Sequence, residues 1–144
     1  MEAGNLDQLP AWASSLLATG RVARLGFLDD RDRPRVLPVT YAIEGGCLWS
    51  AVDRKPKRSP EPARLRYLRR RPEAALTVDR YSDDWSELAW VQVLGRIDLL
   101  DAEAAPPALE ALAAKYSQYR ADPPPGPLLR LTPERVLCWR AEPL

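Results

Sequence analysis

The sequence contains no histidine. Histidine is the most frequent general base, the commonest side-chain ligand of transition metals and the central member of the Ser-His-Asp triad. Its absence therefore argues against these three kinds of catalytic site, and we expect no metal centre. Any chemistry would have to come from a bound cofactor, or from carboxylates and tyrosines.

Long apolar runs and paired cysteines are scarce as well. No apolar run approaches the ~18 residues of a membrane span, and no charged-then-apolar signal sequence stands at the N-terminus. We therefore expect a cytoplasmic protein that does not associate with membranes. Cys47 and Cys138 each lie within an apolar, strand-like pattern. This pattern favours buried, reduced and unreactive thiols over a disulfide or a redox pair.

An excess of charge of one sign is also missing, since the formal net charge is +1. The chain as a whole therefore has no strong attraction to nucleic acid or to membranes, and any basic site must be local. The arginines between Arg64 and Arg71 are the densest basic group. No exposed aromatics are interleaved with them, so a solvated helix face is favoured over a nucleic-acid site.

Length and composition indicate one globular domain, which we expect to span residues 1–144. Hydrophobic residues make up 46% of the chain, and 15 prolines indicate many loops and short elements. The apolar spacing from Leu9 to Leu17 predicts an N-terminal helix with Asp7 as its cap and Gly20 as its end. We expect residues 1–20 to pack on the rest of the domain as this helix.

Three consecutive strands with short connections are predicted next. Val22 to Leu28 forms the first strand, and a polar turn leads into Arg35 to Glu44, which is apolar on both faces. Gly45-Gly46 is a hairpin signal, because paired positive φ angles suit glycine, and Cys47 to Val52 returns as the third strand. We expect both faces of Arg35–Glu44 to be covered.

The rest of the chain alternates short helices with longer strands. A helix is predicted from a Ser59 cap to Pro72, and another from Pro106 to about Tyr119-Arg120. The remaining strands are Glu73–Tyr81, Ala89–Leu100 with a bulge or bend at Gly95, and a closing strand or strand pair, Leu128–Thr132 and Arg135–Ala141.

This order of elements predicts a mainly β fold, an antiparallel β-barrel of six or seven strands with short helices at the connections. The turns between the first three strands are too short for parallel crossovers. No G-x-G-x-x-G turn and no P-loop motif is present. These observations argue against a doubly wound nucleotide-binding fold.

The stretch from Arg35 to Arg58 is the leading candidate for a functional site. It joins the two-faced apolar strand to a basic loop that contains Lys55, Lys57 and Arg58. A helix start at Ser59-Pro60 would add backbone N–H groups that favour an anion. An apolar wall beside a cationic rim suits a flat, phosphorylated cofactor. A solvated surface loop is the alternative interpretation of the three cations.

Pro38 lies in the middle of this predicted strand. Proline has no N–H to donate to a β-ladder. The strand near Pro38 is therefore expected to be at a sheet edge, at a bulge, or against something other than a strand, such as a ring system.

Several segments together resemble a known family. They are RPRVLPVTYAIEGGCLWSAVDRKPKR from Arg33, ARLRYLRRRPEAALTVDRYSDDW from Ala63, and WVQVLGRIDLL from Trp90. They resemble the pyridoxamine-phosphate-oxidase-like split-barrel flavoproteins, and within these the branch of flavin and deazaflavin oxidoreductases that use coenzyme F-420. The similarity extends from Val22 to about Trp139.

The resemblance implies a six-stranded antiparallel split β-barrel of the FMN-binding type that works as a homodimer. In such proteins the isoalloxazine or deazaflavin ring lies in the groove between two subunits. By position, one strand would pass under the ring, a second would line it, and the basic loop would hold the phosphate. The corresponding residues are Leu37, Pro38, Val39 and Thr40; Trp49, Ser50, Ala51 and Val52; and Lys55, Lys57 and Arg58.

The reaction implied is hydride transfer between C5 of the deazaflavin and an electrophilic carbon of a small organic substrate. Such chemistry needs few acid-base residues, which agrees with a chain that lacks histidine. FMN is the alternative cofactor of the same fold. A non-catalytic protein that binds a cofactor, haem or lipid is the alternative from a different functional class.

Overall fold

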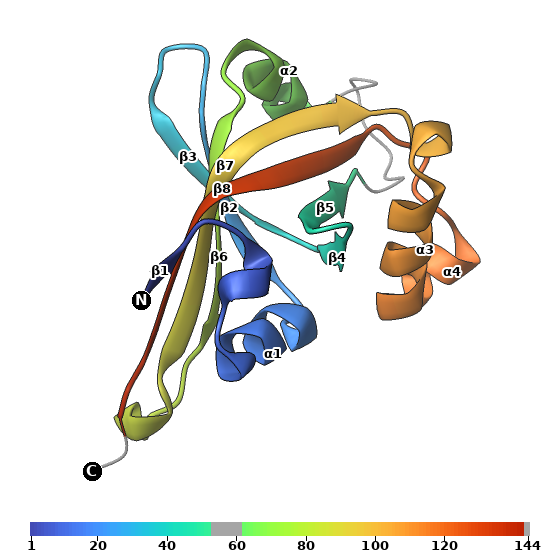
Figure 1. The fold of residues 1–144 in the computed structure, drawn as a ribbon. Coiled ribbons are helices and arrows are strands. Elements are labelled where there is room, and N and C mark those ends of the chain that lie inside the picture. The colour runs from blue at the N-terminus through green and yellow to red at the C-terminus, as the bar shows by residue number, and fades with distance from the viewer. Residues whose placement is uncertain (53–61, 143–144) are drawn as a thin grey trace.

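A computed structural model describes residues 1–52 and 62–142 of the protein. In this part of the chain, eight strands and four α-helices are joined by short connections (Figure 1). The strands are β1 (Glu2–Ala3), β2 (Ala23–Leu28), β3 (Pro34–Val39), β4 (Ala42–Glu44), β5 (Cys47–Ala51), β6 (Glu73–Arg80), β7 (Ala89–Leu100) and β8 (Leu128–Arg140). The α-helices are α1 (Ala11–Thr19), α2 (Ala63–Arg70), α3 (Pro106–Lys115) and α4 (Ser117–Ala121). Short 3-10 helices η1, η2 and η3 cover Leu6–Gln8, Trp85–Glu87 and Ala102–Ala104.

All eight strands belong to one antiparallel sheet. Seven follow the order β3-β2-β6-β7-β8-β5-β4, and β1 pairs with β8. Although β3 and β4 stand at opposite ends of this order, only Thr40 and Tyr41 separate them in the chain. Two residues cannot cross an open sheet of this width, so the sheet must curl until its two ends meet. The result is a barrel whose seam is closed by the chain itself, which agrees with the predicted split barrel.

The prediction of a single strand from Arg35 to Glu44 was wrong, because this segment forms two strands, β3 and β4. Tyr41 lies at the corner between them and donates its backbone N–H to the hydroxyl of Tyr116 instead of to a strand. Within one chain the outer face of β3 is not covered, so the expectation that both faces are covered depends on a second copy and stays a prediction. Pro34, Arg35, Val36 and Pro38 are exposed, and Val36 retains 65% of its accessible surface.

The described residues contain eight strands, not six, partly because β3 and β4 are separate and partly because β1 adds a short edge. The closing segment is one continuous strand, β8, which pairs along the length of β7. The bulge expected at Gly95 is confirmed. The register shifts between Leu94 and Gly95, and Glu134 is the extra residue, because Arg135 pairs with Leu94 and Pro133 with Gly95.

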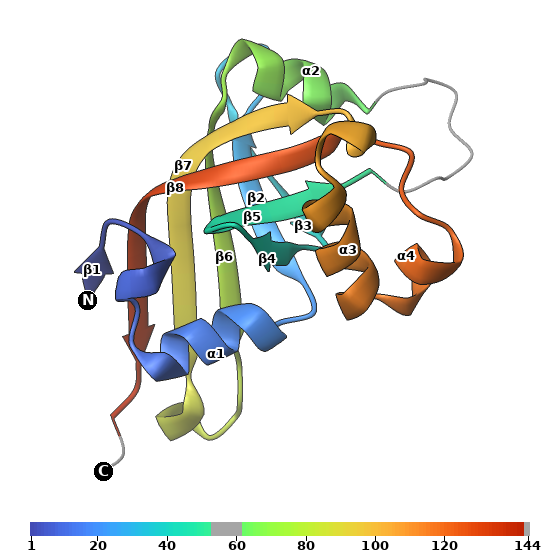
Figure 2. The ribbon, with the colours of Figure 1, turned by 45° about the vertical axis from the view of Figure 1, so that its right-hand side comes forward.

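The helices cover the two ends and one outer face of the barrel (Figures 1 and 2). Ala13 and Leu17 of α1, and Leu65 and Leu68 of α2, are buried in the main core inside the barrel. A second apolar cluster lies between the outer face of β4, β5 and β8 and the pair α3–α4. Among the described residues, no helix is long and apolar enough to cross a membrane.

Three helix boundaries differ from the sequence prediction. Helix α2 begins at Ala63, after Pro62, and the predicted cap Ser59 lies outside the described residues. Helix α1 begins after Pro10, so Asp7 is not its cap; Asp7 lies in η1, while Gly20 ends α1 as expected. The third predicted helix is interrupted at Tyr116, which has an extended backbone with φ −123° and ψ 118°. This break turns the Tyr116 hydroxyl toward the β3–β4 corner, and α4 follows as a separate turn.

Candidate functional site

The β3–β4 corner is held from two sides by hydroxyl groups. The Ser50 hydroxyl of β5 donates to the carbonyl oxygen of Thr40 at 2.6 Å. The Thr40 hydroxyl is hydrogen-bonded to the Tyr119 hydroxyl of α4 at 2.7 Å. Thr40, Ser50 and Tyr119 therefore connect the closing seam of the barrel to β5 and to α4. Two of the three, Thr40 and Ser50, are among the predicted cofactor-binding residues.

Tyr41 and Tyr116 fix the same corner through the hydrogen bonds of their hydroxyl groups. The Tyr116 hydroxyl accepts the N–H of Tyr41 at 3.2 Å and lies 2.9 Å from the carbonyl oxygen of Arg21. The Tyr41 hydroxyl is fully buried and donates to the carbonyl oxygen of Leu17. Burial raises the pKa of Tyr41, and the neighbouring Tyr116 adds to the shift. Tyr41 therefore stays protonated at neutral pH and acts as a structural link between α1 and the corner.

The residues predicted to pass under the ring lie on β3 and at its end. Among the described strands, β3 pairs only with β2, so it is an edge strand, as the position of Pro38 suggested. Pro38 is exposed, Leu37 is half-buried, and Val39 is buried in the main core. The segment thus offers an exposed apolar edge backed by a rigid interior.

The predicted residues of β5, and Val52 directly after it, alternate between the two sides of the chain. Trp49 and Ala51 pack in the second core beneath α3, and the Trp49 indole N–H donates to the carbonyl oxygen of Glu44 at 2.9 Å. Val52 lies in the main core. Only Ser50 reaches the β3–β4 corner with a hydrogen bond. The three predicted phosphate ligands Lys55, Lys57 and Arg58 lie outside the described residues.

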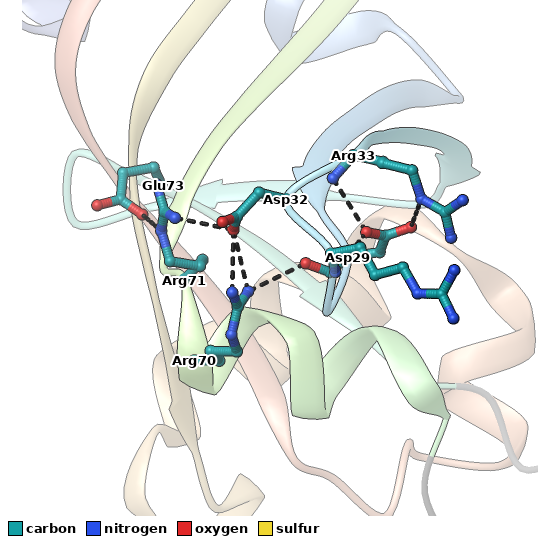
Figure 3. Close-up of polar contacts among 7 residues, drawn as sticks. Asp29, Asp32, Arg33, Arg70, Arg71 and Glu73 are labelled. Carbon is teal, nitrogen blue, oxygen red and sulfur yellow. Dashed lines mark hydrogen bonds and ion pairs between the residues drawn. The ribbon is translucent and has the colours of Figure 1, made fainter.

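A polar network that the sequence analysis missed anchors the β2–β3 turn to α2 (Figure 3). The carboxylate of Asp29 accepts the backbone N–H groups of Arg31 and Arg33 at 2.9 and 3.0 Å, and the Arg33 Nε at 3.3 Å. Arg70 donates to the carbonyl oxygen of Asp29 at 3.1 Å and to the Asp32 carboxylate at 3.1 Å. The turn that leads into β3 is therefore tied to α2.

Asp32 and Arg71 extend this network. Asp32 has φ +57°, a left-handed conformation that aspartate tolerates better than most residues. Its carboxylate accepts from Arg71 at 2.8 Å, and Arg71 lies 3.6 Å from Glu73. Part of the arginine group on α2, expected to be solvated, thus forms ion pairs within the chain. The one signal in the sequence was an aspartate-rich turn opposite an arginine-rich helix, and their proximity depends on the tertiary fold.

A cavity of about 280 Å³ lies beside Trp49, between the β4–β5 hairpin and the start of α3. Leu100, Ala104, Ala105, Pro107 and Ala108 form its apolar wall, and Glu44 and Arg130 are its charged members. Arg130 pairs with Asp98 at 3.2 Å and lies over the Trp49 ring at 5.9 Å. The cavity offers space for a small molecule next to a predicted cofactor residue.

Neither metal-ligand clusters nor a disulfide were found in the described part of the chain. No group of three or more Asp, Glu, Cys or His residues there is arranged to hold a metal ion. Cys47 and Cys138 are both free thiols; Cys138 is buried, as expected, whereas the expectation of burial was wrong for Cys47, which is half-buried.

Comparison with solved structures identifies proteins of the same fold. A conserved hypothetical protein from Mycobacterium tuberculosis aligns with a TM-score of 0.74 and 17% identity, over 92% of this chain and 85% of that one. A heme binding protein from Mycobacterium smegmatis gives a TM-score of 0.74 and 20% identity, over 92% of this chain but 55% of its own length. A FAD-binding protein from Mesorhizobium loti gives 0.66 and 22% identity, over 90% and 94%.

Sequence comparison is more specific about the family. No curated protein matches the chain. The profile of a family described as pyridoxamine 5'-phosphate oxidase matches residues 11–137. This range includes α1, strands β2 to β7 and most of β8. The same description appears for a solved structure of similar fold from Listeria innocua, with a TM-score of 0.60. The chain belongs to the pyridoxamine 5'-phosphate oxidase family.

Proposed function

We propose that the protein is an oxidoreductase that uses the deazaflavin coenzyme F-420 to transfer hydride to or from a small organic substrate. The main observation in support of the proposal is that a member of this family has an exposed apolar edge on β3. Val36 is 65% exposed and Pro38 is exposed beside it, although Leu37 and Val39 point toward the core. A flat ring and a second copy of the chain would together cover this edge.

The residues of the chain suit such a ring. Pro38 has no N–H, so at this position the strand presents no unpaired donor to an apolar ring face. The hydrogen bonds of Ser50 and Tyr119 fix the backbone and hydroxyl of Thr40 before any ligand arrives. Pre-organisation of this kind lowers the entropic cost of binding. The ordered corner would orient the ring, and Lys55, Lys57 and Arg58 would hold its phosphate.

When bound, the deazaflavin supplies the hydride at its C5. The chain's own contribution would be to orient the ring, exclude water and anchor the phosphate, which requires no histidine. Trp49 and Ala51 beneath α3 would support the corner from behind. The cavity beside Trp49 would then be a candidate space for a substrate.

A titration with coenzyme F-420 and, separately, with FMN tests the proposal. We expect saturable binding of F-420 at micromolar concentration, followed by a change in cofactor fluorescence, and weaker binding of FMN. Binding of FMN in preference to F-420 would favour the alternative of a flavin-dependent enzyme of the same fold. If neither cofactor binds to the purified protein, the proposal fails.

A protein that binds a cofactor, haem or lipid without turnover is the second candidate. It is favoured by the fold neighbours, whose names describe a heme binding protein and a FAD-binding protein. The two candidates differ in one measurement. An oxidoreductase, loaded with reduced cofactor, should transfer hydride to some member of a panel of enones, quinones and nitroaromatic acceptors. A binding protein should hold the cofactor without consuming it.

A further inference from the structure

The cavity beside Trp49 is bordered by one acidic and one basic side chain, Glu44 at the end of β4 and Arg130 of β8. Strand pairing places both on the same outer face of the sheet. Glu44 pairs with Cys47, and Trp49, two residues further along β5, pairs with Arg130. Strand β5 lies between β4 and β8 in the sheet. The acid and the base are therefore held one strand apart on a common surface.

In the described part of the chain these two side chains do not pair with each other. The Glu44 carboxylate forms no hydrogen bond or ion pair there, and the Trp49 indole N–H goes to the carbonyl oxygen of Glu44 instead. The Arg130 side chain is 36% exposed, and its Nη2 donates to Asp98 at 3.2 Å. Because its Nε is enclosed, the N–H groups left for a ligand are those of Nη1 and the second one of Nη2.

The wall between β7 and the start of α3 is apolar. It is formed by Leu100, Ala104, Ala105, Pro107 and Ala108. The first turn of α3 offers no free donor to the cavity, because Pro106 and Pro107 have no N–H and the N–H of Ala108 is bonded to Ala105 at 3.1 Å. The volume of about 280 Å³ is near the lower end of the range for small-molecule sites. The cavity thus combines a small apolar space with two opposite charges.

We propose that this cavity binds a small zwitterion, with its carboxylate on Arg130, its ammonium on Glu44 and its apolar body against the wall. Both contacts are charge-assisted hydrogen bonds, and a ligand of one charge could form only one of them. With β5 between them, the backbones of Glu44 and Arg130 are roughly 10 Å apart, which favours a ligand charged at both ends, such as an ω-amino acid. The inference rests on the proposed function only where this ligand is the substrate, because its binding needs no cofactor.

Isothermal titration calorimetry with 6-aminohexanoate, on the intact protein without cofactor, tests the proposal. Hexanoate and hexylamine are the matched control ligands, since each keeps the carbon chain and one of the two charges. We expect 6-aminohexanoate to bind at least ~10-fold more tightly than either control, because each control loses one charge-assisted contact. No saturable binding of 6-aminohexanoate up to about 10 mM, or equal affinity for hexanoate, would overturn the proposal. Failure of the F-420 titration alone would contradict the proposed function and leave this site in place.

Two variants test which side chain holds which charge. Glu44→Gln removes the negative charge with little change in size, and should weaken 6-aminohexanoate ~10-fold without weakening hexanoate. Arg130→Gln should weaken both 6-aminohexanoate and hexanoate, but not hexylamine. Glu103→Gln is the control, because Glu103 is exposed in η3 beside the wall and does not line the cavity. Loss of hexanoate binding in Glu44→Gln, or equal loss of 6-aminohexanoate binding in Glu103→Gln, would show that Glu44 does not hold the ammonium group.

Discussion

Asp29 holds the turn that leads into β3. Its side chain is buried and accepts hydrogen bonds from the backbone of Arg31 and Arg33 and from the Arg33 guanidinium. The backbone N–H of Arg33 contributes most to holding the pKa of Asp29 below its usual value, the N–H of Arg31 and the Arg33 charge add to it, and burial opposes it. Because the folded pKa is lowered, the ionised carboxylate stabilises the fold above the unfolded pKa.

We therefore expect Asp29→Asn to lower the melting temperature by several degrees at pH 7. The stabilisation by the carboxylate is lost as the pH falls through the folded pKa, so the difference from the wild type should shrink below about pH 4. Thermal denaturation across pH 3–7 measures this. Asp30→Asn, at the exposed neighbouring position, is the control and should change little. A difference that is constant with pH would contradict the role of the charge.

The basic loop is the other feature that single residues can test. If Lys55 and Lys57 each donate a charge-assisted hydrogen bond to a cofactor phosphate, removing one should weaken binding by about 1.5–3 kcal/mol, or roughly ten- to a hundredfold. Dissociation constants of Lys55→Ala and Lys57→Ala, measured by cofactor fluorescence, check this, while melting temperatures should not change. A double variant that binds the cofactor within about twofold of the wild type would show that Lys55 and Lys57 do not hold its phosphate.

Among the elements, β7 and β8 have the most demanding geometry. Gly95 faces Pro133 where the register shifts, and a Cβ built on Gly95 would lie 2.0 Å from the carbonyl oxygen of Thr132. Proline is tolerated at position 133 because a bulge leaves a ladder hydrogen bond unmade. The two long strands bend together, and Figure 2 shows them turning over the barrel. Gly95 and the extra residue Glu134 thus allow the sheet to close.

Gly95→Ala should therefore destabilise the protein strongly, by about 3 kcal/mol, because the new methyl group meets backbone that cannot move without breaking the pairing of β7 and β8. Gly26→Ala in β2 is a suitable control. Its Cβ would come no closer than 3.7 Å to any atom, an ordinary contact. Urea denaturation of both variants gives the comparison. Equal stability of the two would show that the close approach at Gly95 is not decisive.

At the scale of the whole molecule, the exposed edge of β3 is a surface that a partner would be expected to cover. Val36 is among the most exposed large hydrophobic residues, and within the part of the chain that the structure describes β3 pairs on one side only. Unprotected edge strands are aggregation-prone, and proteins usually cover them. A second copy of the chain, related by a two-fold axis, is the simplest cover.

We expect the protein to sediment as a homodimer at micromolar concentration. Val36→Lys should shift it toward monomer, because a lysine charge would be buried in the apolar contact. Val22→Lys, at a position that is 38% exposed and precedes β2, serves as the control and should remain dimeric. A wild-type protein that sediments as a well-behaved monomer would contradict the proposed homodimer.

Local sequence determined much of this fold. Alternation of apolar residues located β2, β5, β6 and β7 within one or two residues. Gly45 and Gly46 have φ angles of +60° and +74°, as a two-residue hairpin requires. Pro38 marked an edge strand and Gly95 a bulge, because each residue has one steric property that few positions tolerate. These signals act over a few residues and can therefore be read directly from the sequence.

Tertiary structure decided the remainder, for a common physical reason. The break between β3 and β4, the interruption at Tyr116 and the burial of Asp29 each depend on partners from other parts of the chain. Tyr116 contacts Tyr41 from 75 positions away, and Arg70 contacts Asp29 from 41 positions away. Such contacts carry no local periodicity, so only the folded chain brings these groups together.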